Sequence, residues 1–297
     1  MSRLKIITGP MRVPFLILTP ACVALGIGTA LWEQYAVSYL DAAIVLIGAV
    51  SAHVAVNVLN EISDFSSGLD LRTKRTPFSG GSGTLPGHPE FLKTARLTAL
   101  ISLVAVGSVG IYFIAVRGWQ LLPLGALGIV VVVSYSIFLV RYPLLCLIAP
   151  GLGFGPLMVV GTHYALTGTY SASAFIASMI PFFLVSDLLL LNQFPDVEAD
   201  RTVGRRHLLI AADKHIGSLV YGLFLVLAYV TITLGVGLNF LPTMTLLGLV
   251  TMLAAIPAMF GAFRHNENIG QLLPFMGMNV LINIATPVLM TAGLLMS

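Results

Sequence analysis

The chain has 297 residues, of which 57% are hydrophobic and only 9% are charged. This composition is too apolar for a soluble globular domain, and it indicates an integral membrane protein that crosses the bilayer several times. Its two cysteines, Cys22 and Cys146, both lie in apolar runs, so the sequence indicates neither a disulfide framework nor a Cys-based metal site. The net charge of +3 comes without a basic face that carries interleaved aromatic residues, so we expect no nucleic-acid partner.

Apolar runs of about 20 residues, the length that crosses the hydrocarbon core, predict an all-α membrane protein with about nine spans. These are 13–32, 40–62, 94–116, 120–140, 144–166, 172–194, 217–238, 243–263 and 270–296. Eight spans are the alternative, because only Arg141, Tyr142 and Pro143 divide the fourth span from the fifth. We expect one domain over 1–297. The spacing hints at two related four-helix halves, 13–140 and 144–263, before the last helix 270–296, although identity between the halves is weak.

The lysines and arginines predict the orientation of these spans, because basic residues concentrate in cytoplasmic loops. With the N-terminus inside, every basic residue except Arg117 falls on the cytoplasmic side. We therefore expect a protein of a cell membrane, prokaryotic in type, with a cytoplasmic N-terminus and membrane lipid around its helices.

Two acidic stretches follow the second and sixth predicted spans and carry most of the chemistry that the sequence shows. They are 57–70 (NVLNEISDFSSGLD) and 192–200 (NQFPDVEAD). Four crossings separate them, so both are predicted to face the cytoplasm. Residues three, four and seven apart share a helix face, which aligns Asn57, Asn60 and Asp64. Pro195 is expected to kink or restart the helix of the second stretch.

The oxygen-bearing side chains of these stretches form the predicted site: Asn57, Asn60, Asp64, Asp70, Asn192, Asp196, Glu198 and Asp200. Ionisable groups near membrane depth are costly and therefore indicate function. Oxygen ligands without His or Cys favour Mg²⁺, which typically joins one or two carboxylates to substrate phosphates. Neighbouring cations are available to a diphosphate, namely Arg72, Lys74, Arg75, Arg205 and Arg206. The glycine-rich segment 77–87 can present backbone N–H groups to an anion. The plainer alternative is that all these charges are solvated loop residues.

The two stretches resemble the aspartate-rich motifs of the UbiA superfamily of intramembrane prenyltransferases, which read approximately N-x-x-x-D-x-x-x-D and D-x-x-x-D. Asn60, Asp64 and Asp70 match the first motif in a longer form, with two extra residues before the last aspartate. That form is similar to the 1,4-dihydroxy-2-naphthoate branch. Asp196 and Asp200 match the second motif. The resemblance covers nearly the whole chain.

The resemblance implies nine helices around a central cavity that opens sideways into lipid, where a polyprenyl tail lies. It implies that Mg²⁺ and the diphosphate are held by Asn60, Asp64, Asp70, Asp196 and Asp200, of which the four aspartates are the candidate catalytic residues. Lys74, Arg75 and Arg205 would bind diphosphate oxygens. The chain departs from the family at Glu61, where aspartate is common, and at the run from Arg205 to Leu208. These departures leave the acceptor open.

The expected activity is Mg²⁺-dependent transfer of a polyprenyl group from an allylic diphosphate to an aromatic, quinone-precursor-like acceptor. Tyr135 is a candidate for shielding the allylic cation with its ring face. Arg12 and Arg141 are candidates for binding an acceptor carboxylate, because a guanidinium pairs with a carboxylate through two hydrogen bonds. Asn57 and Asn192 complete the predicted substrate contacts.

Two other functions fit the same residues. A terpene cyclase of the same superfamily would use the diphosphate site without an acceptor. A cation-coupled secondary transporter would bind a cation at the carboxylates, but transporters place such groups near the bilayer midplane on broken helices. Here the acids lie at one membrane face beside cationic loops, which favours phosphate chemistry.

Overall fold

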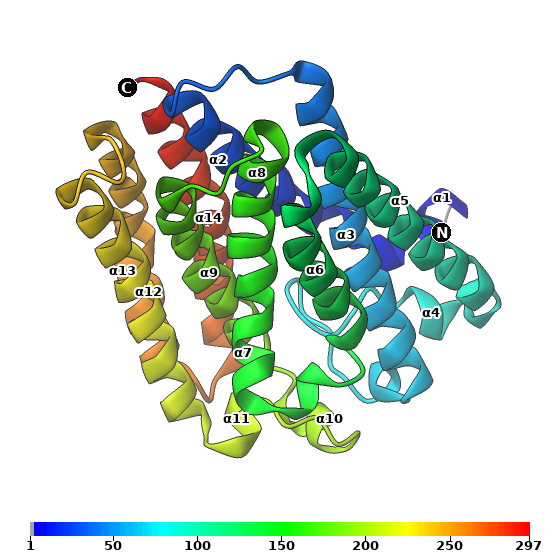
Figure 1. Ribbon diagram of the computed structural model, residues 1–297. Helices are drawn as coiled ribbons and strands as arrows, with labels where there is room; N and C mark the ends of the chain where they lie inside the picture. The colour runs from blue at the N-terminus through cyan, green and yellow to red at the C-terminus, as the bar shows by residue number, and fades with distance from the viewer. Residues whose placement is uncertain (1–2) are drawn as a thin grey trace.

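A computed structural model describes residues 3–297, in which helices and connecting segments make up the chain and no strand occurs (Figure 1). Within this range, eight helical segments are long and apolar enough to span a membrane: Val13–Trp32, Tyr39–Ser66, Pro89–Arg117, Pro143–Thr167, Ala172–Asn192, Lys214–Gly237, Thr243–Arg264 and Ile269–Leu295. A shorter apolar helix, Trp119–Ser134, takes the place of the fourth predicted span. The all-α prediction is confirmed, and each of the nine predicted spans has a helix at its position.

The α-helices are α1 (Arg3–Thr8), α2 (Leu18–Trp32), α3 (Tyr39–Ser66), α4 (Thr84–Gly87), α5 (Leu92–Arg117), α6 (Leu122–Ser134), α7 (Pro143–Leu152), α8 (Gly161–Thr167), α9 (Ala172–Asn192), α10 (Val197–Arg201), α11 (Leu208–Ala211), α12 (Lys214–Gly237), α13 (Met252–Arg264) and α14 (Ile269–Leu295). A π-helix, η7 (Gly153–Val160), joins α7 to α8. Short 3₁₀ segments precede α2, α5, α6 and α13.

Capping side chains set where several long helices begin. Ser38 accepts a hydrogen bond from the backbone N–H of Asp41 at the start of α3, and Asp213 caps α12 in the same way. Ser171 caps α9 and Asn268 caps α14. Small polar residues at these positions satisfy backbone donors that the first helical turn leaves free. Four spans therefore have a local signal for their first residue.

Glycines allow the π-helix region to pack closely on α9. A Cβ atom at Gly151 would lie 2.1 Å from the carbonyl oxygen of Phe182, and one at Gly155 would lie 2.4 Å from that of Ser178. Only glycine permits this backbone approach, which is typical of tight helix pairs in membranes. Pro156 lies within the π-helix, and Phe154 and Met158 of the same segment line the cavity inside the bundle.

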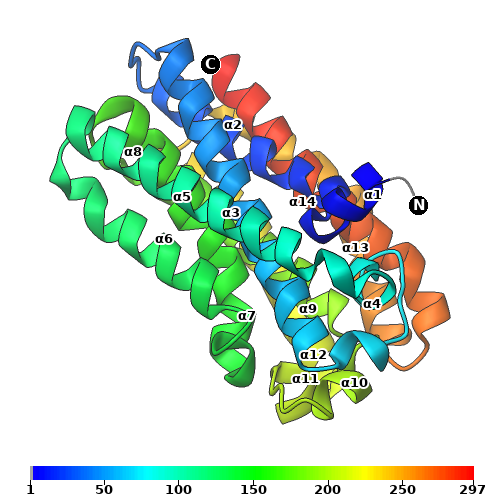
Figure 2. The ribbon, with the colours of Figure 1, turned by 90° about the vertical axis from the view of Figure 1, so that its right-hand side faces the viewer.

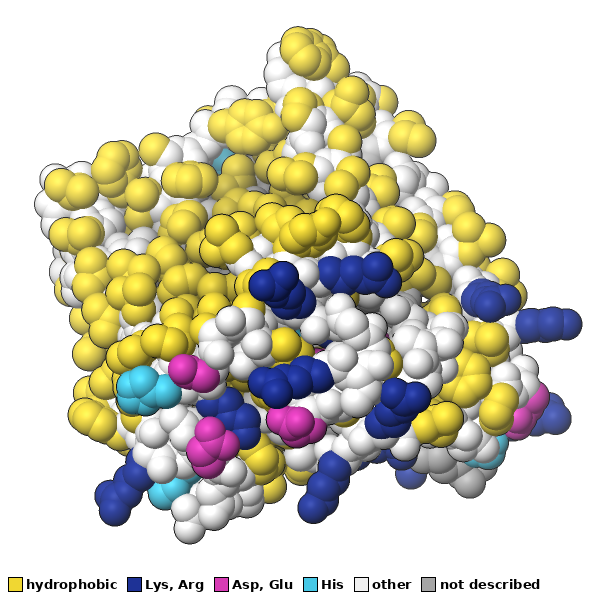
Figure 3. Space-filling view, turned by 90° about the horizontal axis from the view of Figure 1, so that it is seen from below, with side chains coloured by type: hydrophobic (Ala, Val, Ile, Leu, Met, Phe, Trp, Pro, Cys, Tyr) yellow, Lys and Arg dark blue, Asp and Glu magenta, His cyan; other side chains and the backbone are white. Residues whose placement is uncertain are grey.

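The bundle has two chemically different ends. The motif end carries 67–91 and 193–213, and the opposite end carries 33–38 and 168–171. In Figures 1 and 2, α10 and α11 lie at the lower end of the bundle, which is the motif end, and α4 lies in its lower half. Viewed from that end, basic and acidic side chains gather on the face while the flanks are mostly hydrophobic (Figure 3). Both acidic stretches therefore lie at one end of the bundle, as their spacing predicted.

Candidate active site

The first motif occupies the last turns of α3 and the reversal that follows. α3 ends at Ser66, and Gly68 has φ 73°, a left-handed conformation that glycine adopts without strain. The reversal places Asp70 in a 3₁₀ turn, only 5% exposed, beside the carboxylate of Glu61. Asp70 and Glu61 therefore lie close together in a buried part of the site.

The second motif begins where α9 ends. α9 stops at Asn192, Pro195 lies in the turn, and Asp196 precedes the first residue of α10. This confirms the predicted break at Pro195. Asp200 on α10 is only 2% exposed. The turn into α10 is therefore what directs Asp200 toward the first motif.

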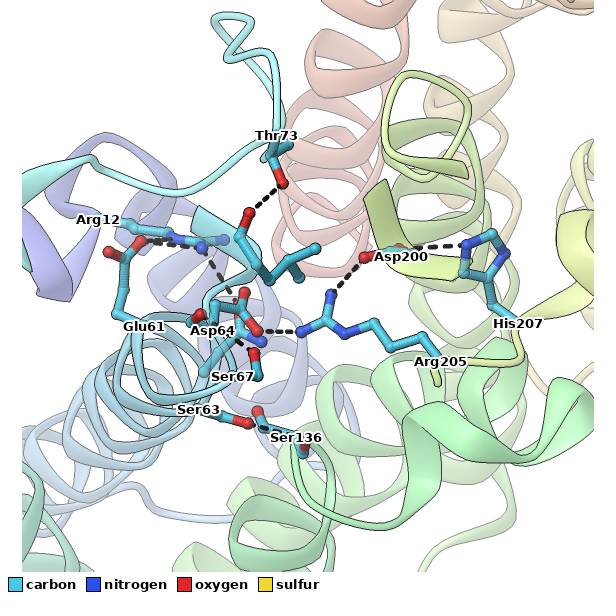
Figure 4. Close-up of polar contacts among 12 residues, drawn as sticks. Arg12, Glu61, Ser63, Asp64, Ser67, Thr73, Ser136, Asp200, Arg205 and His207 are labelled. Atoms are coloured by element: carbon cyan, nitrogen blue, oxygen red, sulfur yellow. Dashed lines mark hydrogen bonds and ion pairs between the residues drawn. The ribbon is translucent and has the colours of Figure 1, made fainter. Parts of the chain in front are cut away.

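Arg205 joins the two motifs (Figure 4). Its Nη1 donates to Asp200 Oδ1 at 3.1 Å, and its Nη2 donates to Asp64 Oδ1. His207 Nε2 lies 3.2 Å from Asp200 Oδ2. Burial lowers the pKa of Arg205, but the charges of Asp64 and Asp200 outweigh burial and raise the pKa above its ordinary value. The motifs therefore converge around a permanently charged guanidinium.

Two aspartates of the site keep an oxygen without a hydrogen-bond partner among residues 3–297. They are Asp70 Oδ2 and Asp196 Oδ1, and both atoms are buried. Burial and the nearby charges of Glu61 and Asp64 raise the pKa of Asp70 to about 7. Burial and the charge of Asp200 raise the pKa of Asp196 to about 7 as well. Unpartnered carboxylate oxygens at this place are available to a cation or a proton.

Glu61 and Arg12 form a second polar group at the same end. Arg12 Nε donates to Glu61 Oε1 at 2.9 Å, and Arg12 Nη2 donates to Asn60 Oδ1 at 3.1 Å. Ser82, in the glycine-rich segment 77–87, donates its backbone N–H and its hydroxyl to the two oxygens of Glu61 at 2.6 and 2.8 Å. The fully buried Glu61 thus ties the segment before α2, the end of α3 and the glycine-rich segment together.

A largely apolar cavity of about 180 Å³ begins at these polar groups and extends into the bundle. Five of the residues predicted to bind substrate line it: Arg12, Asn57, Asn60, Tyr135 and Asn192. Phe154 and Met158 of the π-helix supply apolar wall, and Phe78 closes it from the glycine-rich segment. The charged site and an apolar chamber are therefore continuous.

The predicted cationic residues divide into two groups. Arg75 acts electrostatically on Asp70, and its guanidinium lies so close to Gly83 that a Cβ there would be 2.2 Å away. Gly83 has φ 71°, a left-handed conformation that favours glycine. Lys74, Arg75 and Arg141 are all exposed and none of them lines the cavity, so the electrostatic interaction with Asp70 is what distinguishes Arg75. The structure brings Arg75 and Arg205 to the site, but not Lys74 or Arg141.

Sequence reasoning missed one cavity residue, His53. It lies on α3, four residues before Asn57, and lines the cavity. The available signal was its spacing, because residues four and seven apart share a helix face and Asn57 and Asn60 were already assigned to the site. An isolated histidine in an apolar run carries no motif of its own.

The residues of the site fit a divalent cation whose remaining ligands come from water and from the substrate. In residues 3–297, no three His, Cys, Asp or Glu side chains stand close enough together to hold a metal ion unaided. Mg²⁺ is usually held by one or two carboxylates plus waters and substrate phosphates, so it does not need such a cage. The unpartnered oxygens of Asp70 and Asp196 and the all-oxygen donor set match this type of binding.

Comparisons with known proteins agree with this geometry. A family model described as the UbiA prenyltransferase family matches residues 17–280. A 2-carboxy-1,4-naphthoquinone phytyltransferase from Synechocystis sp. is 24% identical over 232 residues, which is 75% of this chain and 69% of the relative. A 1,4-dihydroxy-2-naphthoate octaprenyltransferase from Bacillus subtilis is 26% identical over 196 residues, 65% of this chain and 62% of the relative, so less than two thirds of that enzyme is matched.

Among solved structures, the apo structure of a UbiA homolog from Aeropyrum pernix K1 has the same fold. The TM-score is 0.71 at 18% identity, with 95% of this chain and 97% of the other covered. The motif resemblance, the family match over most of the chain and the shared fold lead to one conclusion. The chain is a prenyltransferase that belongs to the UbiA prenyltransferase family.

Proposed function

We propose that the protein transfers a polyprenyl group from an allylic diphosphate to a naphthoate-type aromatic acceptor, with Mg²⁺ as its metal. The observation that carries this proposal is the meeting of Asp64 and Asp200 on Arg205, one helical turn beyond Asn60, which lines an apolar cavity. A diphosphate headgroup fits the charged mouth and a prenyl tail fits the chamber. The two relatives named for naphthoate substrates support the acceptor class.

Binding of the diphosphate begins with charge. Asn60, Asp64, Asp70, Asp196 and Asp200 are the residues that would hold Mg²⁺. When bound, the metal neutralises the diphosphate and stabilises the charge that grows on it as it leaves. A guanidinium has five N–H donors, and Asp64 and Asp200 use two of those on Arg205, so the others are available to diphosphate oxygens. Arg75, beside Asp70, adds a second cation.

Cleavage of the allylic C–O bond leaves a resonance-stabilised cation and a diphosphate. Positive groups placed in advance around the leaving oxygen lower the barrier to this step. Tyr135 and Phe154 line the cavity, where their aromatic rings can stabilise the cation and keep water from it. The ring of the acceptor then attacks the cation at carbon.

Arg12 is the residue that we assign to the acceptor carboxylate. It lies at the cavity mouth and is held in place by Glu61 and Asn60, which use Nε and Nη2. The remaining donors of its guanidinium can pair with a carboxylate. We further propose that the motif end faces the cytoplasm, which follows from the distribution of lysine and arginine.

The test is incubation of the purified protein in lipid nanodiscs with Mg²⁺, allylic diphosphates of increasing length and 1,4-dihydroxy-2-naphthoate. We expect a prenylated product by mass analysis and diphosphate release that requires both Mg²⁺ and the acceptor. Diphosphate release at the same rate without any acceptor would instead indicate a cyclase or a hydrolase.

A further inference from the structure

His53 is an ionisable side chain inside the cavity that the reaction outlined above leaves unused. Its Nδ1 lies 2.8 Å from the hydroxyl of Thr19 on α2. Its ring is nearly perpendicular to that of Phe154 of the π-helix, with ring centroids 4.8 Å apart. Three elements therefore fix the imidazole, while its Nε2 has no hydrogen-bond partner among residues 3–297.

Its place on α3 connects it to the substrate site. His53, Asn57 and Asn60 are four and three residues apart, so they share the helix face that lines the cavity. Seven residues of α-helix rise about 10 Å, which separates His53 from the motif residue Asn60 by about the length of a small aromatic acceptor. A ring whose carboxylate pairs with Arg12 at the mouth extends toward His53.

The other ionisable groups of the cavity are already committed. Among the described residues that line it, only Arg12, Tyr135 and His53 carry ionisable side chains. Arg12 is paired with Glu61, and a guanidinium is not a base at physiological pH. A neutral imidazole is therefore the available proton acceptor, and it is oriented by a second group as general bases usually are.

We propose that His53 binds a hydroxyl group of the aromatic acceptor through Nε2 and accepts its proton as the ring attacks; this rests on the prenyl transfer proposed above. With Nδ1–H donating to Thr19, Nε2 presents a lone pair to the cavity. The O–H bond breaks, its electron pair flows into the ring, and a ring carbon bonds to the allylic carbon as diphosphate leaves with the C–O electrons. The substituent at that ring carbon then leaves without its bonding electrons, a carboxylate as CO₂ or a hydrogen as H⁺ to water. Those electrons restore the aromatic ring as the imidazolium returns its proton to the oxygen.

The experiment combines one substitution in the protein with one chemical change in the acceptor and measures both changes separately and together. His53→Gln is compared with the unmodified protein, using 1,4-dihydroxy-2-naphthoate and each of its monomethyl ethers as acceptors. We expect His53→Gln to lower kcat for the dihydroxy acceptor by about 100-fold or more, a typical general-base contribution. Methylating the contacted hydroxyl should cause a similar loss in the unmodified protein, and the variant should lose little further activity with that ether.

A second histidine supplies the matched control. His163 is also fully buried, and its Nδ1 also pairs with a threonine of α2, Thr29, at 3.0 Å. It does not line the cavity, and its Nε2 lies 3.6 Å from Glu33. His163→Gln should lower the unfolding temperature without changing kcat per folded molecule. Thr19→Val, which removes only the orienting group, should give a smaller loss of kcat than His53→Gln.

Three outcomes separate the explanations. Near-normal kcat in folded His53→Gln would overturn the assignment of His53. The assignment would also be overturned if methylation of the acceptor lowered kcat by the same factor in His53→Gln as in the unmodified protein. A failure of the unmodified protein to prenylate any acceptor would overturn the proposed function instead. If His53→Gln does not fold, Thr19→Val is tested with the same ethers instead. If Thr19 only positions His53, the loss of kcat in Thr19→Val should disappear with the ether whose methyl group replaces the proton that His53 would accept.

Discussion

The two ends of the bundle use the same residue types for different purposes. At the opposite end, Asp41 receives one hydrogen bond from Arg117 and one from Tyr112, both at 2.8 Å, so each carboxylate oxygen has a donor. At the motif end, Asp70 and Asp196 each retain a buried oxygen without a donor. A closed ion pair stabilises structure, whereas unsatisfied carboxylates are ready for a ligand. This difference also explains Arg117, the basic residue that the predicted orientation placed on the far side: its charge is paired.

The largest effect should come from removing a carboxylate at the motif end. We expect Asp64→Ala and Asp196→Ala each to lower kcat for prenyl transfer by about 10³-fold, as losses of transition-state charge stabilisation do. Both variants should still fold. Asp196→Ala removes an oxygen that has no partner, whereas Asp64→Ala should also lower the unfolding temperature because it takes a carboxylate from the largely buried Arg205. Product formation by mass analysis and thermal unfolding in detergent measure the two quantities. Near-normal turnover in both variants would contradict the site assignment.

The matched change at the opposite end should have the reverse signature. Asp41→Ala leaves Arg117 without its carboxylate, and breaking such a partly buried pair costs about 3 kcal/mol of stability. We expect a lower unfolding temperature with kcat per folded molecule unchanged. Loss of turnover without loss of stability would show that the opposite end also takes part in the chemistry.

The comparison also predicts how pH acts on the motif end. Asp70 and Asp196, with pKa values of about 7, bind protons in the folded ligand-free protein at pH values where the unfolded chain does not. The stability of the ligand-free protein should therefore fall as pH rises from about 4 to 7. Mg²⁺ with a diphosphate analogue competes with these protons, so its apparent affinity should rise with pH up to about 7.

The expected rise in affinity is about tenfold per pH unit for each proton displaced. Isothermal titration calorimetry of Mg²⁺ and an unreactive prenyl diphosphate analogue between pH 5.5 and 8 measures it. Asp41→Asn, which changes a carboxylate at the opposite end of the bundle, serves as the control. An affinity that does not change with pH would contradict the raised pKa values.

Much of the fold could be predicted from the sequence because hydrophobicity is a local property. Each apolar run became a helix, and the shortest one, Trp119–Ser134, replaced the fourth predicted span. The break at Pro195 was also predictable, since proline lacks the N–H that a helix interior requires. The placement of both motifs at one end followed from the even number of crossings between them, and Arg205, which contacts both, confirms it.

Other parts of the site depend on contacts between distant segments, which no local pattern records. His53 faces the cavity because Thr19 and Phe154 hold it there, and neither neighbour is close to it in sequence. Glu61 was noted only for standing where aspartate is common. Its role as a tie between Arg12 and Ser82 needs the folding of the glycine-rich segment over α3.

The contacts of Glu61 with Arg12 and Ser82 should give the smallest expected effect on the kinetics. Glu61→Gln keeps a hydrogen-bond acceptor for Ser82 but removes the charge that holds Arg12, so the acceptor KM should rise about tenfold with little change in kcat. Ser82→Ala leaves the backbone bond to Glu61 and removes two hydrogen bonds of the hydroxyl, the one that it donates to Glu61 and the one that it accepts from the backbone N–H of Thr84. Only the first acts on Glu61, and its worth of about 1 kcal/mol corresponds to a change in KM of about fivefold. Steady-state kinetics over a range of acceptor concentrations measures both. If Glu61→Gln lowers kcat as strongly as Asp64→Ala, then Glu61 acts directly on the diphosphate site and not through Arg12.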